Sequence, residues 1–204
     1  MIHCLSYTPV ATEHTVLRNM FEARKRVFID LLRWNLPVLA GRFEVDSFDN
    51  DEATYVVLSD DDGAHRASAR LLATTGPHIL STLFETLCDG DVPRGPTTME
   101  ITRFCLERRS NAAQRRQARD ELVHALVDHA LAHGIKRYTG VAEAPWLRQI
   151  LSFGWRCRPL GQIKTIGGSE LGAMLIEIGD DTRALLERGG LAAPASRVEN
   201  RHVH

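Results

Sequence analysis

The chain has 204 residues, of which 44% are hydrophobic and 25% are charged, with a formal net charge of −1. This length fits one domain with a short tail, and the near-zero charge argues against nucleic acid held by overall charge. No apolar run approaches the roughly 20 residues that span a bilayer, and the N-terminus lacks a signal-peptide pattern. We therefore expect a cytoplasmic protein with no membrane and no nucleic-acid partner.

The first half of the chain predicts a helix, a loop and a hairpin. Apolar residues recur at helical spacing over 13–34. Residues 35–52 have weak periodicity and several carboxylates, and a loop of this length is often functional. Strands are expected over 53–59 and 65–75, with a turn at 60–63 between them.

The second half alternates helices and strands. The expected elements are a helix over 78–87, a strand over 97–107, a helix over 111–133, a strand over 136–142, a helix over 145–153, a strand over 171–178 and a short helix after residue 180. Hairpin strands and βαβ units are mixed, so the predicted fold class is α/β, a mixed twisted sheet flanked by helices. One domain is expected over 1–190, with a flexible tail over 191–204.

The four cysteines are widely scattered and form no CxxC pair, which indicates reduced thiols and weakens a zinc or thioredoxin-like interpretation. Cys105 is a candidate nucleophile. A small buried apolar residue is the favoured interpretation.

A first cluster of candidate site residues comprises Arg24, Phe28 and Trp34. Arg24 falls within the apolar stripe of the first helix, so its charge should be paired, line a cleft or reach water along the side chain. A cation beside two aromatic rings can hold a ligand that has both a carboxylate and a planar ring. The alternative is an ordinary aromatic core.

A second cluster comprises Glu44, Asp46 and Asp49. A metal site is disfavoured because no histidine, cysteine or EF-hand pattern supports it. Pairing with arginines is favoured, and a solvated acidic loop is the alternative. The candidate partners are Arg24, Arg70 and Arg103.

A third cluster comprises Glu100 and Arg103, in a segment that predicts a strand. In a regular strand these two side chains point to opposite faces, because the period is two residues. They can serve one site only if the strand bulges or splays. The alternative is a surface pair beside a core strand.

The motifs occur in the order Arg24-x-x-x-Phe28-x-x-x-x-x-Trp34, Glu44-x-Asp46-x-x-Asp49, Arg70-Leu71-Leu72-x-Thr74-x-x-Pro77, Phe84 and Glu100-x-x-Arg103-Phe104. Their order and spacing over residues 20–110 resemble those of the LuxI-type acyl-homoserine-lactone synthases, or autoinducer synthases. The stretches 138–141 and 151–155 are similar too, with less specific motifs.

This resemblance implies a fold similar to that of the GNAT acetyltransferases, with a V-shaped opening between two central strands for an acyl-pantetheine arm. It implies transfer of an acyl group from acyl carrier protein or acyl-CoA to the amine of S-adenosylmethionine. Lactone closure would then release methylthioadenosine and yield a quorum-sensing signal. S-adenosylmethionine is a substrate in this scheme, and no cofactor or metal is expected.

The resemblance also implies roles for individual residues. Glu100 and Arg103 would be catalytic, and Met99 and Thr139 would line the acyl pocket. The residues expected to bind S-adenosylmethionine and to fix the lid over it are Arg24, Phe28, Trp34, Asp46, Asp49, Arg70, Phe84 and Phe104. Met99 stands where many relatives have an aromatic residue, and Thr139 matches a position associated with acyl chains substituted at the third carbon.

A local basic patch consists of Arg108, Arg109, Arg115, Arg116 and Arg119, with Lys136 and Arg137. It could receive an acidic acyl carrier protein or the phosphates of coenzyme A, or it could be a solvated helix start.

Two alternatives remain open. An ordinary GNAT N-acetyltransferase using acetyl-CoA would hold pyrophosphate in a glycine-bearing loop before a helix. No glycine occurs between residues 96 and 133, which favours the synthase. A non-catalytic carrier-protein-binding module would not require the charged clusters to converge.

Overall fold

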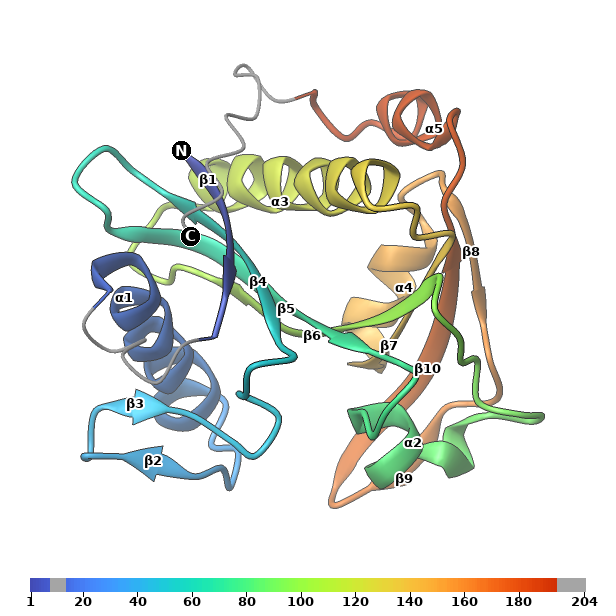
Figure 1. Cartoon of the computed structure of the whole chain (residues 1–204), viewed down its shortest axis with the longest axis horizontal. Helices are drawn as coiled ribbons and strands as arrows, with labels where there is room; N and C mark the ends of the chain where they lie inside the picture. The colour runs from blue at the N-terminus through green and yellow to red at the C-terminus, as the bar shows by residue number, and fades with distance from the viewer. Residues whose placement is uncertain (8–13, 194–204) are drawn as a thin grey trace. The chain divides into compact units, whose positions relative to one another are not determined.

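The computed structural model describes residues 1–7 and 14–193 (Figure 1). The flexible tail expected over 191–204 lies outside the described residues from position 194 onward. The described chain falls into two compact units, one built from Met1–Leu71 and Arg103–Ala125, the other from Leu72–Thr102 and Leu126–Ala193. A single domain over 1–190 stays a prediction.

Eight strands form one mixed sheet, in the order β1-β4-β5-β6-β7-β10-β8, with β9 paired to β10. β6 and β7 are parallel, whereas β4 pairs antiparallel with β1 and β5, and β10 pairs antiparallel with β7, β8 and β9. The expected mixed sheet is therefore confirmed. The strands are β1 (Ile2–Ser6), β4 (Thr54–Ser59), β5 (His65–Ala73), β6 (Thr98–Leu106), β7 (Arg137–Glu143), β8 (Arg156–Pro159), β9 (Lys164–Ile166) and β10 (Ser169–Glu177).

In the first unit, helix α1 (Thr15–Arg24) continues directly into η1 (Lys25–Leu31), which is a π-helix. The helix expected over 13–34 is thus confirmed in place and ends earlier. Phe21 of α1 packs edge-on against Tyr55 of β4, with ring centroids 5.7 Å apart. The acidic loop contains a short hairpin of β2 (Val38–Leu39) and β3 (Phe43–Glu44), which lies beside α1.

Strand β6 carries an irregularity at Arg103. Buried and half-exposed residues alternate from Thr98 to Thr102, and then two half-exposed residues follow each other. At that point Arg103 has φ +51°, the left-handed conformation that residues with a side chain rarely adopt. The regular alternation of the strand is therefore broken at Arg103, whereas a bulge or a splay that brings Glu100 and Arg103 to one site stays a prediction.

In the second unit, α2 (Ile79–Leu83) and η2 (Glu85–Leu87) precede β6, and α4 (Ala144–Leu151) packs against β7 and β10. The long helix α3 (Ala112–Ala132) begins in the first unit and ends in the second. α5 (Thr182–Arg188) closes the described part of the chain. No helix among the described residues is long and apolar enough to cross a membrane.

The ladder between β6 and β7 is short. It joins Thr98 to Arg137, Met99 to Tyr138 and Glu100 to Thr139, although β6 has nine residues and β7 has seven. The pairing of the two strands ends at Glu100, so the ladder covers only the first part of each strand.

Candidate functional site

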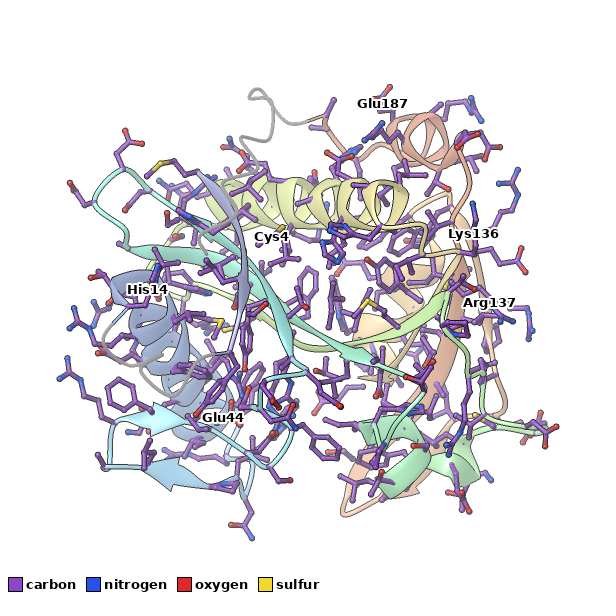
Figure 2. All side chains as sticks on the ribbon, in the orientation of Figure 1. Cys4, His14, Glu44, Lys136, Arg137 and Glu187 are labelled. Atoms are coloured by element: carbon purple, nitrogen blue, oxygen red, sulfur yellow. The ribbon has the colours of Figure 1, made fainter. Side chains whose placement is uncertain are left out.

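Arg24 is the centre of a buried ionic lattice in the first unit. It lies in the last turn of α1 with 1% of its surface exposed. Its Nε atom donates to Glu44 Oε2 at 2.5 Å, and its two Nη atoms donate to the carboxylate of Asp49 at 2.9 and 2.8 Å. Figure 2 labels Glu44 beside α1 and β3. A guanidinium with a full set of carboxylate acceptors is paired rather than extended to water, which settles the question raised by its place in the apolar stripe.

Two further arginines extend the lattice from strands. Arg70 of β5 donates to both oxygens of Asp46, at 2.6 and 3.1 Å, and lies 2.8 Å from Asp49. Arg103 of β6 donates to Glu44 at 3.1 Å and to Asp46 at 2.6 Å. Three cations and three anions from distant parts of the first unit therefore meet in one network.

The acidic segment is held by its own backbone as well. The N–H of Asp46 donates to Asp49, and the N–H of Phe48 donates back to Asp46, each at 2.8 Å. The hydroxyl of Tyr55 donates to Asp49 at 2.8 Å. These bonds fix the loop as a rigid wall of the lattice rather than a solvated acidic loop.

The carboxylates of Glu44, Asp46 and Asp49 lie within 4.8 Å of one another, close enough to be considered as a metal site. Each of them accepts a hydrogen bond from at least one of the three arginines. Cations fixed in the protein thus occupy the positions that a metal ion would need. The interpretation as arginine partners is confirmed.

The lattice favours the charged forms of Asp46, Asp49 and Arg24. Burial alone would raise the pKa of Asp49, but the charges of Arg24 and Arg70 outweigh it and hold the pKa well below its usual value. Burial acts in the same sense on Asp46, and its hydrogen bonds and charge interaction with Arg70 lower the pKa below the usual value. Burial would lower the pKa of Arg24, and Asp49 and Glu44 raise it instead.

The π-helix places an aromatic pair next to this lattice. Just after the π-helix, where Arg33 has φ +60°, the N–H of Trp34 donates to the carbonyl of Phe28 at 2.9 Å. The two rings are stacked, with centroids 4.9 Å apart and planes 10° apart. The Arg103 guanidinium lies 5.8 Å from the centroid of the Phe28 ring. Phe28 is buried and Trp34 is partly exposed, so the pair can offer one ring face to a ligand.

Glu100 belongs to the second unit and is fully buried. Its Oε1 atom accepts the backbone N–H of Leu80, in the first turn of α2, at 2.9 Å. Glu100 is in register with Thr139 of β7, which is also fully buried, so the two side chains share one face of the sheet. Met99 points to the opposite face, together with Tyr138.

Phe84 follows α2 in the second unit. It is partly buried and packs against the cluster of Leu80, Leu87 and Ala173. Phe104 follows Arg103 on β6, in the first unit, and is half-exposed. The roles assigned to Phe84, Met99, Phe104 and Thr139 stay predictions.

Cys105 is completely buried, and burial raises the pKa of its thiol to about 12. A thiol with this pKa has almost no thiolate at neutral pH, which argues against a nucleophile. All four cysteines are free.

Glu44 is the lattice member that the expected site set omitted. It bridges Arg24 and Arg103 and is completely buried. Its position two residues before Asp46 was the feature of the sequence that could have placed it in the site set. The basic patch divides between the units, because Arg108 to Arg119 lie in the first and Lys136 and Arg137, labelled in Figure 2, lie in the second.

A family described as autoinducer synthase matches residues 10–186, most of the chain. The chain belongs to this family. An acyl-homoserine-lactone synthase of Ralstonia nicotianae is 36% identical to this autoinducer synthase over 170 residues, which cover 80% of the chain and 82% of the relative. One from Rhizobium etli is 32% identical over 185 residues, covering 89% and 85%.

Among solved structures, the CoA-dependent acyl-homoserine lactone synthase BjaI, with SAM and isopentyl-CoA, has a TM-score of 0.83 and 26% identity. The similarity covers 100% of this autoinducer synthase and 94% of BjaI. The GNAT-like fold and the LuxI-type resemblance are therefore confirmed, and the match supports a synthase rather than an ordinary acetyltransferase.

Proposed function

We propose that this autoinducer synthase is an acyl-homoserine-lactone synthase, an acyltransferase that joins an acyl thioester to S-adenosylmethionine. The observation that carries the proposal is the meeting of Arg24, Arg70 and Arg103 with three carboxylates beside the Phe28–Trp34 pair. A non-catalytic binding module would not need this convergence. The relatives' printed activity supports the same conclusion.

In this proposal the lattice holds the wall of the S-adenosylmethionine site, and the aromatic pair covers the ligand. The three arginines and three carboxylates of the lattice balance one another's charge and are buried. The lattice would therefore position the site wall rigidly rather than attract the ligand by a net charge. The π face of the aromatic pair suits an adenine ring and the adjacent sulfonium cation. Phe84 would form a further wall of the substrate site.

Glu100 is the proposed general base, acting directly or through water. The α-amine of S-adenosylmethionine must lose a proton before it can attack, and its ordinary pKa of roughly 7.7–8.0 makes this easy near neutral pH. The amine nitrogen then bonds to the thioester carbonyl carbon, and the thiol of the donor leaves. Backbone N–H groups where β6 leaves β7 would stabilise the tetrahedral oxyanion.

Lactone closure needs only proximity and orientation. A carboxylate oxygen of the acylated product attacks its own γ-carbon, and the bond from that carbon to sulfur breaks. Methylthioadenosine is a good leaving group, because breaking this bond converts the positively charged sulfonium into a neutral thioether. The Arg103 side chain would help to hold the methionyl part in the folded conformation that this attack requires.

The acyl donor is acyl carrier protein or acyl-CoA. The solved structure of BjaI with SAM and isopentyl-CoA supports a site for an acyl thioester in this fold. Action in the cytoplasm is part of the same proposal, and the product would serve as a quorum-sensing signal.

Mass spectrometry of lactones extracted from cells that have no synthase of their own tests this function. Cells expressing the wild-type protein should release an acyl-homoserine lactone. Cells expressing Glu100→Gln or Arg103→Ala should release none, while the purified variants keep the wild-type circular dichroism spectrum. Full lactone production by either folded variant would remove that residue from its assigned role, and no lactone from wild type would contradict the proposed function.

A further inference from the structure

Two histidines lie side by side at the C-terminal end of α3, both within the second unit. His129 is in the last turn of the helix, and His133 follows directly after its last residue. The backbone N–H of His133 donates to the carbonyl of His129 at 3.1 Å, so the helical spacing continues and the two side chains share one face. Their rings are stacked, with centroids 4.2 Å apart and planes 26° apart. His129 is buried, whereas His133 is exposed, so the pair reaches the surface.

The ring of His133 is held in one tautomer. Its Nδ1 atom lies 2.8 Å from the carbonyl oxygen of His129. A carbonyl oxygen only accepts hydrogen bonds, so Nδ1 carries the hydrogen and the lone pair of the neutral ring is on Nε2. Histidines that bind metal ions commonly have this arrangement, in which one ring N–H donates to a backbone carbonyl and the other ring nitrogen binds the ion.

The ring of His129 supplies a second, independent observation. Its side chain is 8% exposed, and its Nδ1 atom is buried without a hydrogen-bond partner among residues 1–7 and 14–193. A buried polar atom of this kind is costly unless water or an ion binds it. Burial, with a smaller contribution from His133, lowers the pKa of His129 to about 4. The ring is therefore neutral at pH 7, which is the form that binds metal ions.

The geometry of the pair suits one metal ion. Imidazole nitrogens bind Zn²⁺ at about 2.0–2.1 Å, so two of them on one ion lie roughly 3 Å apart and their rings lie side by side. Two histidines four positions apart on one helix face hold zinc in the H-E-x-x-H motif as well. The C-terminal end of a helix carries a partial negative charge, which also favours a cation.

We propose that His129 and His133 together bind one divalent transition-metal ion at the end of α3. Water would complete the coordination, because no third histidine, cysteine or carboxylate joins the pair in a cluster within the described part of the chain. Imidazole ligands suit Zn²⁺, Ni²⁺ and Cu²⁺, whereas Mg²⁺ and Ca²⁺ prefer oxygen ligands. An ion bound by the folded pair would also stabilise the folded chain.

The test is isothermal titration calorimetry of the full-length protein with Ni²⁺ and Zn²⁺, together with melting curves in the presence and absence of each ion. His129→Gln and His133→Gln each remove one proposed ligand. His133 is exposed, so its variant should keep the wild-type circular dichroism spectrum even if the buried His129→Gln variant does not. The matched control replaces His202 and His204, which lie outside the described residues, by glutamine.

We expect wild type to bind one ion at the pair. Each helix variant should lose this ion or bind it at least about tenfold more weakly, since even loss of a group that only supports a ligand costs 10–100-fold. Ni²⁺ should raise the melting temperature of wild type and of the control by several degrees, and that of His133→Gln by much less. Mg²⁺ should have no effect on any of them. Neither histidine belongs to the proposed catalytic or substrate-binding residues, so His133→Gln should produce lactone as wild type does.

The same number of bound ions with the same affinity in His133→Gln as in wild type would overturn the proposal. Loss of all binding in the control variant would overturn it as well, because the ion would then be held at positions 202 and 204. Absence of Ni²⁺ and Zn²⁺ binding to wild type would also contradict it.

Discussion

At the scale of single residues, the charged side chains of the lattice stabilise the fold and also belong to the candidate site. Arg24 pairs with two carboxylates that are themselves almost completely buried, so removal of the guanidinium breaks these buried ion pairs. Glu44 then keeps only Arg103, and Asp49 only Arg70, as an arginine partner among the described residues. Breaking a buried ion pair in this way costs much more than the pair contributes against an apolar replacement. The same side chains therefore support both the structure and the proposed wall of the S-adenosylmethionine site.

The Arg24→Ala variant should lower the free energy of unfolding by about 3–5 kcal/mol, measured by urea denaturation at pH 7. Arg156→Ala is the control, because it removes an exposed ion pair with Asp181, and it should change the unfolding free energy far less. An equal loss of unfolding free energy in the two variants would contradict a larger contribution from the buried lattice than from an exposed ion pair.

His65 supplies a test of pH dependence. Its side chain is buried, its Nε2 atom lies 2.9 Å from Ser68 Oγ, and Glu107 and Arg26 are the charged groups near it. Burial lowers the pKa of His65 to about 4, below the ordinary value of about 6.5 in an unfolded chain. The folded state therefore binds fewer protons between these values, and the contribution to stability is present above pH 6.5 and is lost as the pH falls toward 4.

Urea unfolding at several pH values should show this loss. Between pH 7 and pH 4, His65→Gln should lose less stability than wild type, by up to about 3 kcal/mol. Parallel curves for the two proteins would contradict the buried neutral imidazole.

At the scale of elements, hydrophobic periodicity located the long helices and the hairpin strands, because each buries a continuous apolar face. The short strands β1, β8 and β9 were not expected. They have only five, four and three residues, too few for a pattern to stand out, and they depend on partners far along the chain. The hairpin β2–β3 was likewise hidden within the acidic loop.

Two local backbone irregularities lie at the candidate site, and only one of them could be predicted from the sequence. Strand alternation predicted an irregularity, a bulge or a splay, between Glu100 and Arg103, and Arg103 has a left-handed backbone conformation. The π-helix from Lys25 to Leu31 has no comparable signal, since the sequence there reads as ordinary amphipathic helix. The stacked Phe28–Trp34 geometry could therefore not be predicted, although the residues themselves were identified.

The packing of α5 in the second unit gives a test at this scale. A Cβ atom on Gly189, just after α5, would lie 2.1 Å from the carbonyl oxygen of Phe153, which is fixed backbone. Gly189→Ala should therefore lower the melting temperature by several degrees, since a backbone clash of this kind costs at least about 1–3 kcal/mol. Gly90→Ala is the control, because a Cβ there has nothing within 4 Å. An unchanged melting temperature in Gly189→Ala would contradict this packing.

At the scale of the whole molecule, composition argued against some classes of protein but did not identify the family. The net charge of −1 and the absence of long apolar runs fit very many enzymes. The ordered set of charged and aromatic residues indicated the family, because the order and spacing of several motifs together are more specific than any one of them. The lattice could be anticipated from its residue types, whereas the pairing of particular partners required the folded chain.

In the proposed reaction one chain both acylates S-adenosylmethionine and closes the lactone. Purified protein incubated with S-adenosylmethionine and an acyl thioester, on carrier protein or on coenzyme A, tests it by quantitative mass spectrometry of all products. We predict that acyl-homoserine lactone and methylthioadenosine accumulate in equal molar amounts. An acylated amine without release of methylthioadenosine would contradict the account.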